Sequence, residues 1–147
     1  MRKVALIDYS SSSVSLLIAK TEGSVMESIL HTRTPLSFAG SVYQDRKLTE
    51  IEIPELLDIT DSFIITCKEN GVSNLYAIAS ANLASVKGID DILALVTEKT
   101  GLGIYKLDMA TEAEARIFAN ERYSILPHST LIDFGSITTK IYSFSDY

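Results

Sequence analysis

The sequence predicts a single α/β domain, and three observations lead to this prediction. The chain has 147 residues, of which 46% are hydrophobic and 22% are charged, so it has enough apolar side chains to bury one core. Its first third consists of short apolar runs that are typical of strands. Over the rest of the chain, strand-like and helix-like segments alternate, which is the pattern of an α/β protein.

The first three strands are expected to form an antiparallel meander. Residues 3–9 are a nearly continuous apolar run that stops at an acid, Asp8, and this is typical of a strand buried on both faces. Residues 14–20 and 25–33 are the next two strands, preceded by a serine turn and by a turn that contains glycine. Residues 34–49 have no clear period and predict a loop.

Helical spacing of apolar residues predicts an amphipathic helix over residues 50–69. Because proline has no N–H to donate, the regular part of this helix is expected to begin near Pro54. The segments that follow alternate: a strand over residues 75–79, a helix over 89–100 and a strand over 103–107.

A third helix is expected from residue 111 to about residue 123. Thr111 is placed as its N-cap, and Glu114 follows three residues later, which is the spacing of a capping box. Two further strands, residues 130–133 and 138–144, complete the chain.

The charge pattern argues against two classes of partner. The net charge is −6, the isoelectric point is near 4.8, and the basic residues do not cluster, whereas nucleic acids and anionic membranes need concentrated positive charge. The single cysteine, Cys67, cannot form an internal disulfide. The first twenty residues contain neither a signal-peptide core nor a membrane span, so the expected location is the cytoplasm.

Two segments, residues 5–18 and residues 130–142, resemble each other. Each has a strand that ends in an aspartate (Asp8 and Asp133), a turn of small and hydroxyl-bearing residues, and a returning strand. Such a hairpin offers N–H and hydroxyl groups to a phosphate, while its aspartate holds a divalent cation or the water bound to it. Two such hairpins facing each other would hold a polyphosphate. Each hairpin taken alone is better explained as an ordinary tight turn, and the presence of two such hairpins favours the phosphate site.

At these motifs the chain resembles the N-terminal part of the exopolyphosphatase and guanosine pentaphosphate phosphohydrolase family, which belongs to the actin-like ATPase superfamily. The first phosphate loop of the family, Asp-x-Gly-Ser-Asn-Ser-x-Arg, corresponds to residues 8–15. The second loop, Asp-x-Gly-Gly-Gly-Ser-Thr-Glu, corresponds to residues 133–140. Residues 113–116, Ala-Glu-Ala-Arg, match three letters of the family's Glu-Glu-Ala-Arg motif. The resemblance extends from residue 4 to about residue 143.

The resemblance implies a fold and an activity. The implied fold is a ribonuclease-H-like lobe with a mixed sheet of about five strands and helices on its faces. In the family a second lobe follows, and the active site lies in the cleft between the two lobes. The implied activity is hydrolysis of phosphoanhydride bonds in polyphosphate or guanosine pentaphosphate, with Mg²⁺ as the cofactor. A homodimer is one assembly that the sequence allows.

The resemblance also assigns roles to residues. Glu114 corresponds to the catalytic base, although it fits a capping box equally well, and Asp8 and Asp133 correspond to the ligands of Mg²⁺. Arg116 is interpreted as a charge on the helix surface. The expected contacts to phosphate come from both loops: Ser11, Ser12, Ser13, Gly135, Ser136 and Thr138.

Several departures from the family motifs favour a different function. The arginine of the first loop is Ser15 here, one glycine of the second loop is Ile137, and its glutamate is Lys140. The arginine of a third family motif, expected near residues 77–84, is missing. Because bidentate guanidinium groups hold phosphate strongly, the sequence predicts weak binding of polyphosphate. The alternative function is that of a non-catalytic relative used for nucleotide or phosphate sensing or for protein assembly.

Overall fold

The computed structural model divides into two compact units, residues 1–107 and 108–147, and each is described by itself. The described residues are 2–23, 25–36, 52–119, 130–134 and 139–143. That the chain forms a single domain stays a prediction. None of the helices among the described residues has the length and apolar character needed to cross a bilayer.

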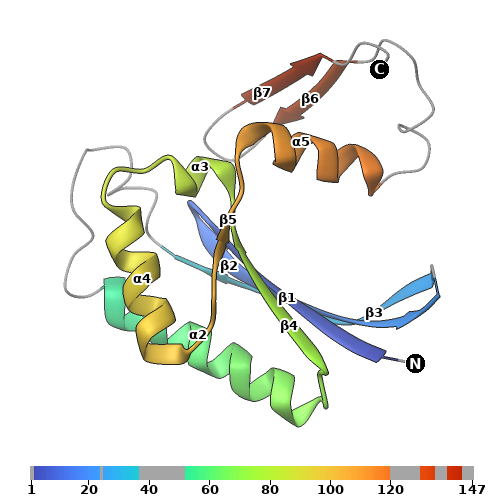
Figure 1. Cartoon of the computed structure of the whole chain (residues 1–147), viewed down its shortest axis with the longest axis vertical. Coiled ribbons are helices and arrows are strands. Elements are labelled where there is room, and N and C mark those ends of the chain that lie inside the picture. Colours follow the sequence, from blue (N-terminus) through green and yellow to red (C-terminus); the bar gives the residue numbers. More distant parts are fainter. Residues whose placement is uncertain (1, 24, 37–51, 120–129, 135–138, 144–147) are drawn as a thin grey trace. The chain divides into compact units, whose positions relative to one another are not determined.

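The first unit contains a five-stranded mixed sheet in the order β3-β2-β1-β4-β5 (Figure 1). Its strands are β1 (Arg2–Ser10), β2 (Ser13–Glu22), β3 (Val25–Pro35), β4 (Asn74–Ala79) and β5 (Tyr105–Lys106). The first three strands pair antiparallel, whereas β1 pairs with β4, and β4 with β5, in parallel. The predicted mixed sheet and the antiparallel meander are confirmed, and β1 is the central strand.

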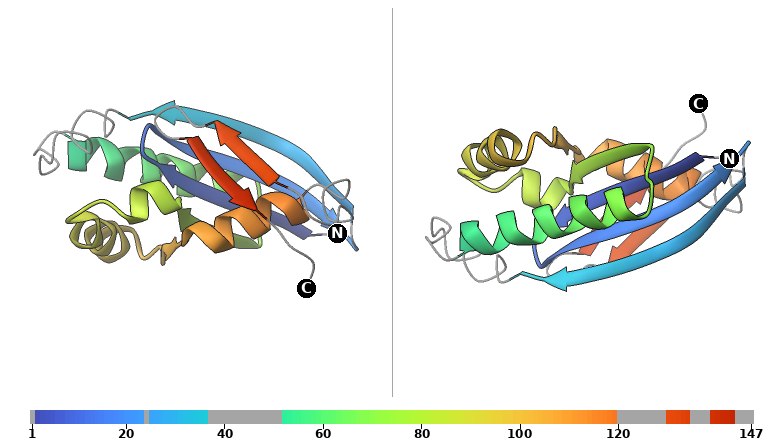
Figure 2. Two further views of the ribbon diagram at one scale, coloured as in Figure 1. Left: turned by 90° about the horizontal axis from the view of Figure 1, so that it is seen from above. Right: turned by 90° about the horizontal axis from the view of Figure 1, so that it is seen from below.

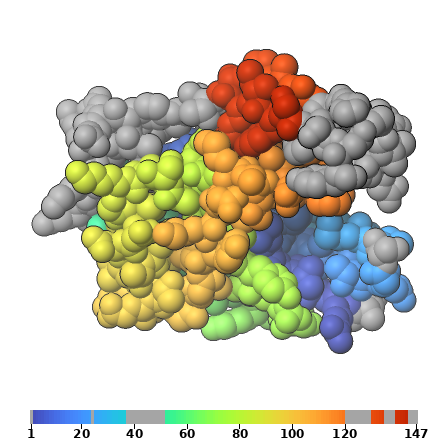
Figure 3. Space-filling model, turned by 45° about the horizontal axis from the view of Figure 1, so that its top comes forward, coloured from blue at the N-terminus to red at the C-terminus, as the bar shows by residue number. Residues whose placement is uncertain are grey.

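The helices of the first unit are α2 (Glu52–Glu69), α3 (Ala81–Ala84) and α4 (Ile89–Thr100). Figure 2 shows α2 running along one face of the strands, and Figure 3 shows α3 and α4 lying against each other. The bounds of α4 agree with the prediction, and Gly101 ends the helix with a left-handed φ of 72°. Pro54 lies in the first turn of α2, where its missing N–H costs no helical hydrogen bond.

The core of the first unit lies between one face of the sheet and the helices. The buried side chains alternate along the strands and recur along the helices; they include Ala5, Ile7, Tyr9, Val14, Leu16, Ile18, Leu56, Phe63, Cys67, Leu93 and Val96. The alternation has a direct consequence for the site, because successive side chains of a strand point to opposite faces. Asp8 and Ser10 flank the buried Tyr9 and therefore project from the other face of β1.

The second unit consists of one helix and one hairpin. They are α5 (Met109–Phe118), β6 (Thr130–Phe134) and β7 (Thr139–Ser143), and the two strands pair antiparallel. Residues 120–129 and 135–138 lie outside the described residues, so the predicted end of the helix near residue 123 is not tested.

The predicted capping box at the start of α5 is wrong, because the helix begins two residues earlier. Its N-cap is Asp108, whose Oδ1 accepts a hydrogen bond of 2.7 Å from the backbone N–H of Thr111. This hydrogen bond holds the pKa of the Asp108 carboxyl below its ordinary value. Both residues are good N-caps, and the aspartate adds a negative charge at the positive end of the helix dipole. Glu114 therefore lies beyond the first turn, where it has no capping role.

Candidate functional site

The hairpin between β1 and β2 has the geometry of a tight polar loop at the end of the central strand. Ser10 pairs with Ser13, so that only Ser11 and Ser12 connect the two strands. Asp8 lies two residues before the end of β1, opposite Ser15 of β2. The predicted aspartate and its serine turn thus occupy one small region of the sheet.

A chain of hydroxyl groups fixes this turn. The Ser10 hydroxyl donates to the backbone oxygen of Ser13 at 2.9 Å, and the two serine hydroxyls lie 3.0 Å apart. Because Ser10 donates its single hydroxyl proton to the Ser13 backbone oxygen, the Ser13 hydroxyl must donate to the Ser10 hydroxyl oxygen. Among the predicted phosphate contacts, Ser11 and Ser13 are buried, whereas Ser12 is half-buried. Ser12 is therefore the most accessible of these three serines.

A buried hydrogen bond anchors β1 from behind the loop. Tyr9 and Thr60 are both completely buried, and their hydroxyl oxygens lie 2.9 Å apart. Thr60 also donates to the backbone oxygen of Leu56 in α2 at 2.8 Å. Burial raises the pKa of Tyr9 to about 12, although the hydrogen bond to Thr60 opposes the shift. The strand that carries Asp8 and Ser10 is thereby bound to the helix layer.

The second hairpin is described only along its strands. Asp133 of β6 and Lys140 of β7 are register partners. The predicted phosphate contacts in the turn, Gly135, Ser136 and Thr138, lie outside the described residues and stay predictions.

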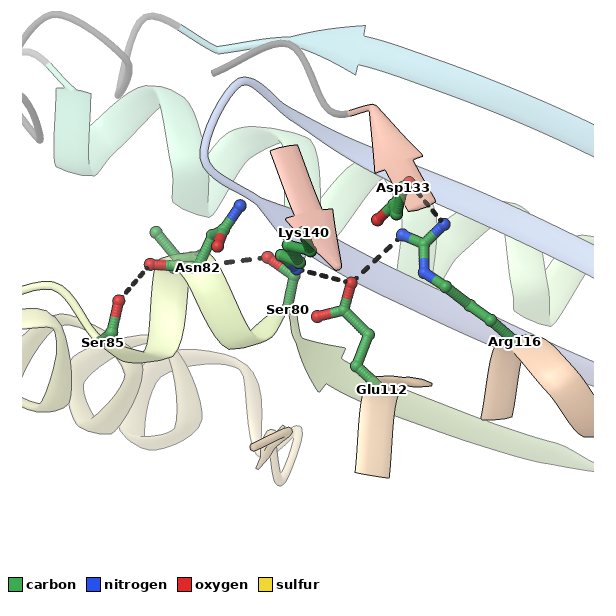
Figure 4. A network of polar contacts seen from close by, with 8 residues as sticks. Ser80, Asn82, Ser85, Glu112, Arg116, Asp133 and Lys140 are labelled. Atoms are coloured by element: carbon green, nitrogen blue, oxygen red, sulfur yellow. Dashed lines mark hydrogen bonds and ion pairs between the residues drawn. The ribbon is translucent and has the colours of Figure 1, made fainter. Parts of the chain in front are cut away.

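Four charged side chains of the second unit form one network (Figure 4). Lys140 Nζ lies 3.0 Å from Glu112 Oε1, and Arg116 Nη2 lies 3.1 Å from the same oxygen. Arg116 Nη1 also donates to Asp133 Oδ1 at 3.2 Å. Arg116, predicted to be a charge on the helix surface, also bridges α5 and β6. Glu112 was not among the predicted site residues, although its spacing of four residues from Arg116 is a recognisable signal for an ion pair.

The roles of three further predicted site residues are not tested by the structure. Glu114 is exposed on α5 and lies two residues beyond Glu112, which takes part in the network. Asp8 and Asp133 belong to different units, so a shared metal site stays a prediction.

No protein-family model and no curated protein matches the sequence. Solved structures match it closely in fold. The type II variant of the Aquifex aeolicus Ppx/GppA phosphatase matches with a TM-score of 0.80 at 22% identity, over 99% of this chain and 49% of that one. An exopolyphosphatase from Cytophaga hutchinsonii matches with a TM-score of 0.77 at 15% identity, over 98% of this chain and 51% of that one. The fold is that of the Ppx/GppA phosphatases.

The similarity extends more weakly to a further protein. The ethanolamine utilization protein EutJ from Carboxydothermus hydrogenoformans matches with a TM-score of 0.57 at 14% identity, over 99% of this chain and 48% of that one. The chain spans about half the length of each of these proteins. The predicted fold class, a ribonuclease-H-like lobe of the actin-like ATPase type with a mixed five-stranded sheet, is confirmed.

Within this Ppx/GppA fold, one residue at the first hairpin was missed by sequence analysis. Arg33 of β3 donates from Nε to Ser13 Oγ at 2.7 Å and from Nη2 to Ser12 Oγ at 3.3 Å. It is also the register partner of Ser15, the position at which the resemblance placed an arginine. Arg33 lies 18 positions after Ser15 in the sequence, and only the register between β2 and β3 brings it to the hairpin.

Proposed function

We propose that the protein hydrolyses phosphoanhydride bonds and releases the terminal phosphate of polyphosphate or guanosine pentaphosphate. The observation that carries this proposal is the position of Asp8 and the serine turn at the end of the central strand, in a fold shared with Ppx/GppA phosphatases. Hydroxyl groups in a tight hairpin at that position suit the binding of phosphoryl oxygens.

The proposed chemistry divides between positioning and proton transfer. Ser12 and its neighbours in the turn would orient the terminal phosphate. The Glu114 carboxylate would take a proton from the attacking water, and its exposure leaves it accessible to that water. In phosphoryl transfer the protein does little covalent chemistry, so most of the rate acceleration comes from positioning the reactants and from electrostatic stabilisation.

Mg²⁺ is the cofactor that the family resemblance implies, and the residues fit it in part. Aspartate oxygens are the ligands that Mg²⁺ prefers, and Asp8 supplies them beside the serine turn. Asp133 is engaged through Oδ1 by Arg116, so a cation at Asp133 would compete with the guanidinium. When bound, Mg²⁺ neutralises charge on the phosphate oxygens.

The test is release of inorganic phosphate from polyphosphate and from guanosine pentaphosphate by the full-length protein with Mg²⁺. We expect release from at least one substrate and its loss when Mg²⁺ is removed with a chelator. Protein inactivated by heat is the control for spontaneous hydrolysis. If neither substrate releases phosphate above that control, the proposal must be abandoned for both.

One observation favours a second candidate, a non-catalytic relative that senses phosphate or a nucleotide, or that assembles with another protein. Lys140 takes the place of the family's glutamate in the second loop, and its Nζ is paired with Glu112 at 3.0 Å. An ion pair at this position supports a structural use of the second hairpin. Binding of phosphate compounds without hydrolysis would favour this candidate.

A further inference from the structure

We propose that Arg33 supplies the positive charge of the first phosphate loop from β3, and that Arg33 and Ser12 form a binding site for a terminal phosphoryl group, with Ser13 holding the guanidinium in place. This inference rests on the proposed function, because it names the group that would hold the same substrate. The sequence predicts that the first loop has lost its positive charge, because Ser15 replaces the family's arginine. Arg33 of β3 would restore that charge from the strand next to β2.

The pairing of three strands places Arg33 on the correct face. Asp8 of β1 is opposite Ser15 of β2, and Ser15 is opposite Arg33 of β3. Side chains that are opposite each other in a sheet share a face, so the three residues form a row across the strands. Neighbouring strands lie about 4.8 Å apart, a distance that an arginine side chain can span. The small Ser15 therefore stands between Asp8 and a long basic side chain.

Two hydrogen bonds fix the guanidinium at the turn. The Nε–H donates to Ser13 Oγ at 2.7 Å, and Nη2 donates to Ser12 Oγ at 3.3 Å. In addition, the backbone N–H of Leu36 donates to the Ser12 carbonyl at 3.0 Å, which joins the end of β3 to the turn. Arg33 and the serine turn are thus held as one unit, so that little conformational entropy remains to be lost on binding.

The guanidinium retains donors for a ligand. An arginine carries five N–H donors in a planar fork, and the hydrogen bonds of Arg33 to described residues use two of them. Arg33 is exposed, so a phosphate in solvent can reach it. A planar fork beside serine hydroxyls matches the oxygens of a terminal phosphate, which accepts paired hydrogen bonds from arginine.

A structural role for Arg33, in which it only ties β3 to the hairpin, makes a different prediction. Hydrogen bonds to two neutral hydroxyls do not require a positive charge, and glutamine can supply an N–H donor in their place. Phosphate binding does require the charge. The Arg33→Gln variant therefore separates the two roles, and Arg33→Lys tests whether charge alone is sufficient.

The experiment is calorimetric titration of the full-length protein with inorganic tripolyphosphate at low ionic strength, where electrostatic attraction is least screened. Arg33→Gln is expected to weaken binding roughly 10-fold or more, and Arg33→Lys to weaken it less. The matched control is Arg2→Gln, which removes an equal charge from an exposed residue at the opposite end of β1. Its affinity is expected to stay within about 2-fold of wild type. Melting temperatures are recorded for every variant.

The outcomes separate this inference from the proposed function. If wild type binds and Arg33→Gln binds as tightly as Arg2→Gln, Arg33 is only a structural tie, while the proposed function stands. If wild type does not bind tripolyphosphate even at low salt, the Arg33 site is overturned, whereas the proposed function is decided separately by the phosphate-release assay. A selective loss of affinity in Arg33→Gln, with an unchanged melting temperature, supports the site.

Discussion

The Glu114→Gln variant of the full-length protein is expected to release phosphate roughly 10²-fold more slowly than wild type, which is the scale of general-base catalysis. Glutamine has nearly the same size as glutamate but cannot accept the proton of the attacking water. The melting temperature should hardly change, because Glu114 is exposed and lies beyond the capped first turn of α5. Initial rates at saturating substrate and thermal unfolding are the two measurements.

The matched control is the same substitution two residues earlier. Glu112→Gln removes the carboxylate that pairs with Lys140 and Arg116 in the second unit, so we expect it to lower the melting temperature. Equal rates for wild type and Glu114→Gln would show that Glu114 is not the base. If Glu114→Gln lowered both the rate and the melting temperature, Glu114 would have a structural role instead.

The Thr60→Val variant is expected to lose about 1–3 kcal/mol of unfolding free energy, because it leaves the Tyr9 hydroxyl without its acceptor in the core. The Thr60 hydroxyl donates to the Leu56 carbonyl, so Tyr9 must donate to Thr60. Valine nearly preserves the shape of threonine, which limits the change to the polar group. Urea unfolding followed by circular dichroism gives the free energy.

The companion variants test whether the hydrogen bond causes this loss. Tyr9→Phe removes the donor, leaves Thr60 its partner in Leu56, and is expected to cost about 0.5–1.5 kcal/mol. The double variant leaves neither group unsatisfied, so it should be more stable than Thr60→Val alone. Strictly additive losses would mean that the two hydroxyls act independently.

Much of the fold could be predicted because its elements repeat a clear period. The bounds of α4 follow from its apolar spacing and from Gly101, and the three N-terminal strands follow from apolar runs between turns. The four residues of α3 are too few to show a period, so this helix was missed. At α5 two good N-caps compete, and sequence alone did not favour Asp108 over Thr111.

The site was less accessible to sequence reasoning, for a physical reason. A motif predicts a residue only at its own position in the chain, and at the position of the family's arginine this chain has Ser15. Arg33 lies 18 positions later and meets the loop only through the register between β2 and β3. Lys140 similarly forms an ion pair with Glu112, which lies 28 positions earlier in the chain. Neither position in the sequence predicts the other.

The central claim is that the β1–β2 hairpin holds a phosphoryl group, and titration of isotope-labelled full-length protein with tripolyphosphate, followed by nuclear magnetic resonance, tests it most directly. We predict saturable shifts that are largest at the backbone amides of Ser11, Ser12 and Ser13 and at the Nε–H of Arg33. The contradicting result is tripolyphosphate binding that shifts residues elsewhere and leaves these four signals unchanged, because the hairpin would then be an ordinary turn.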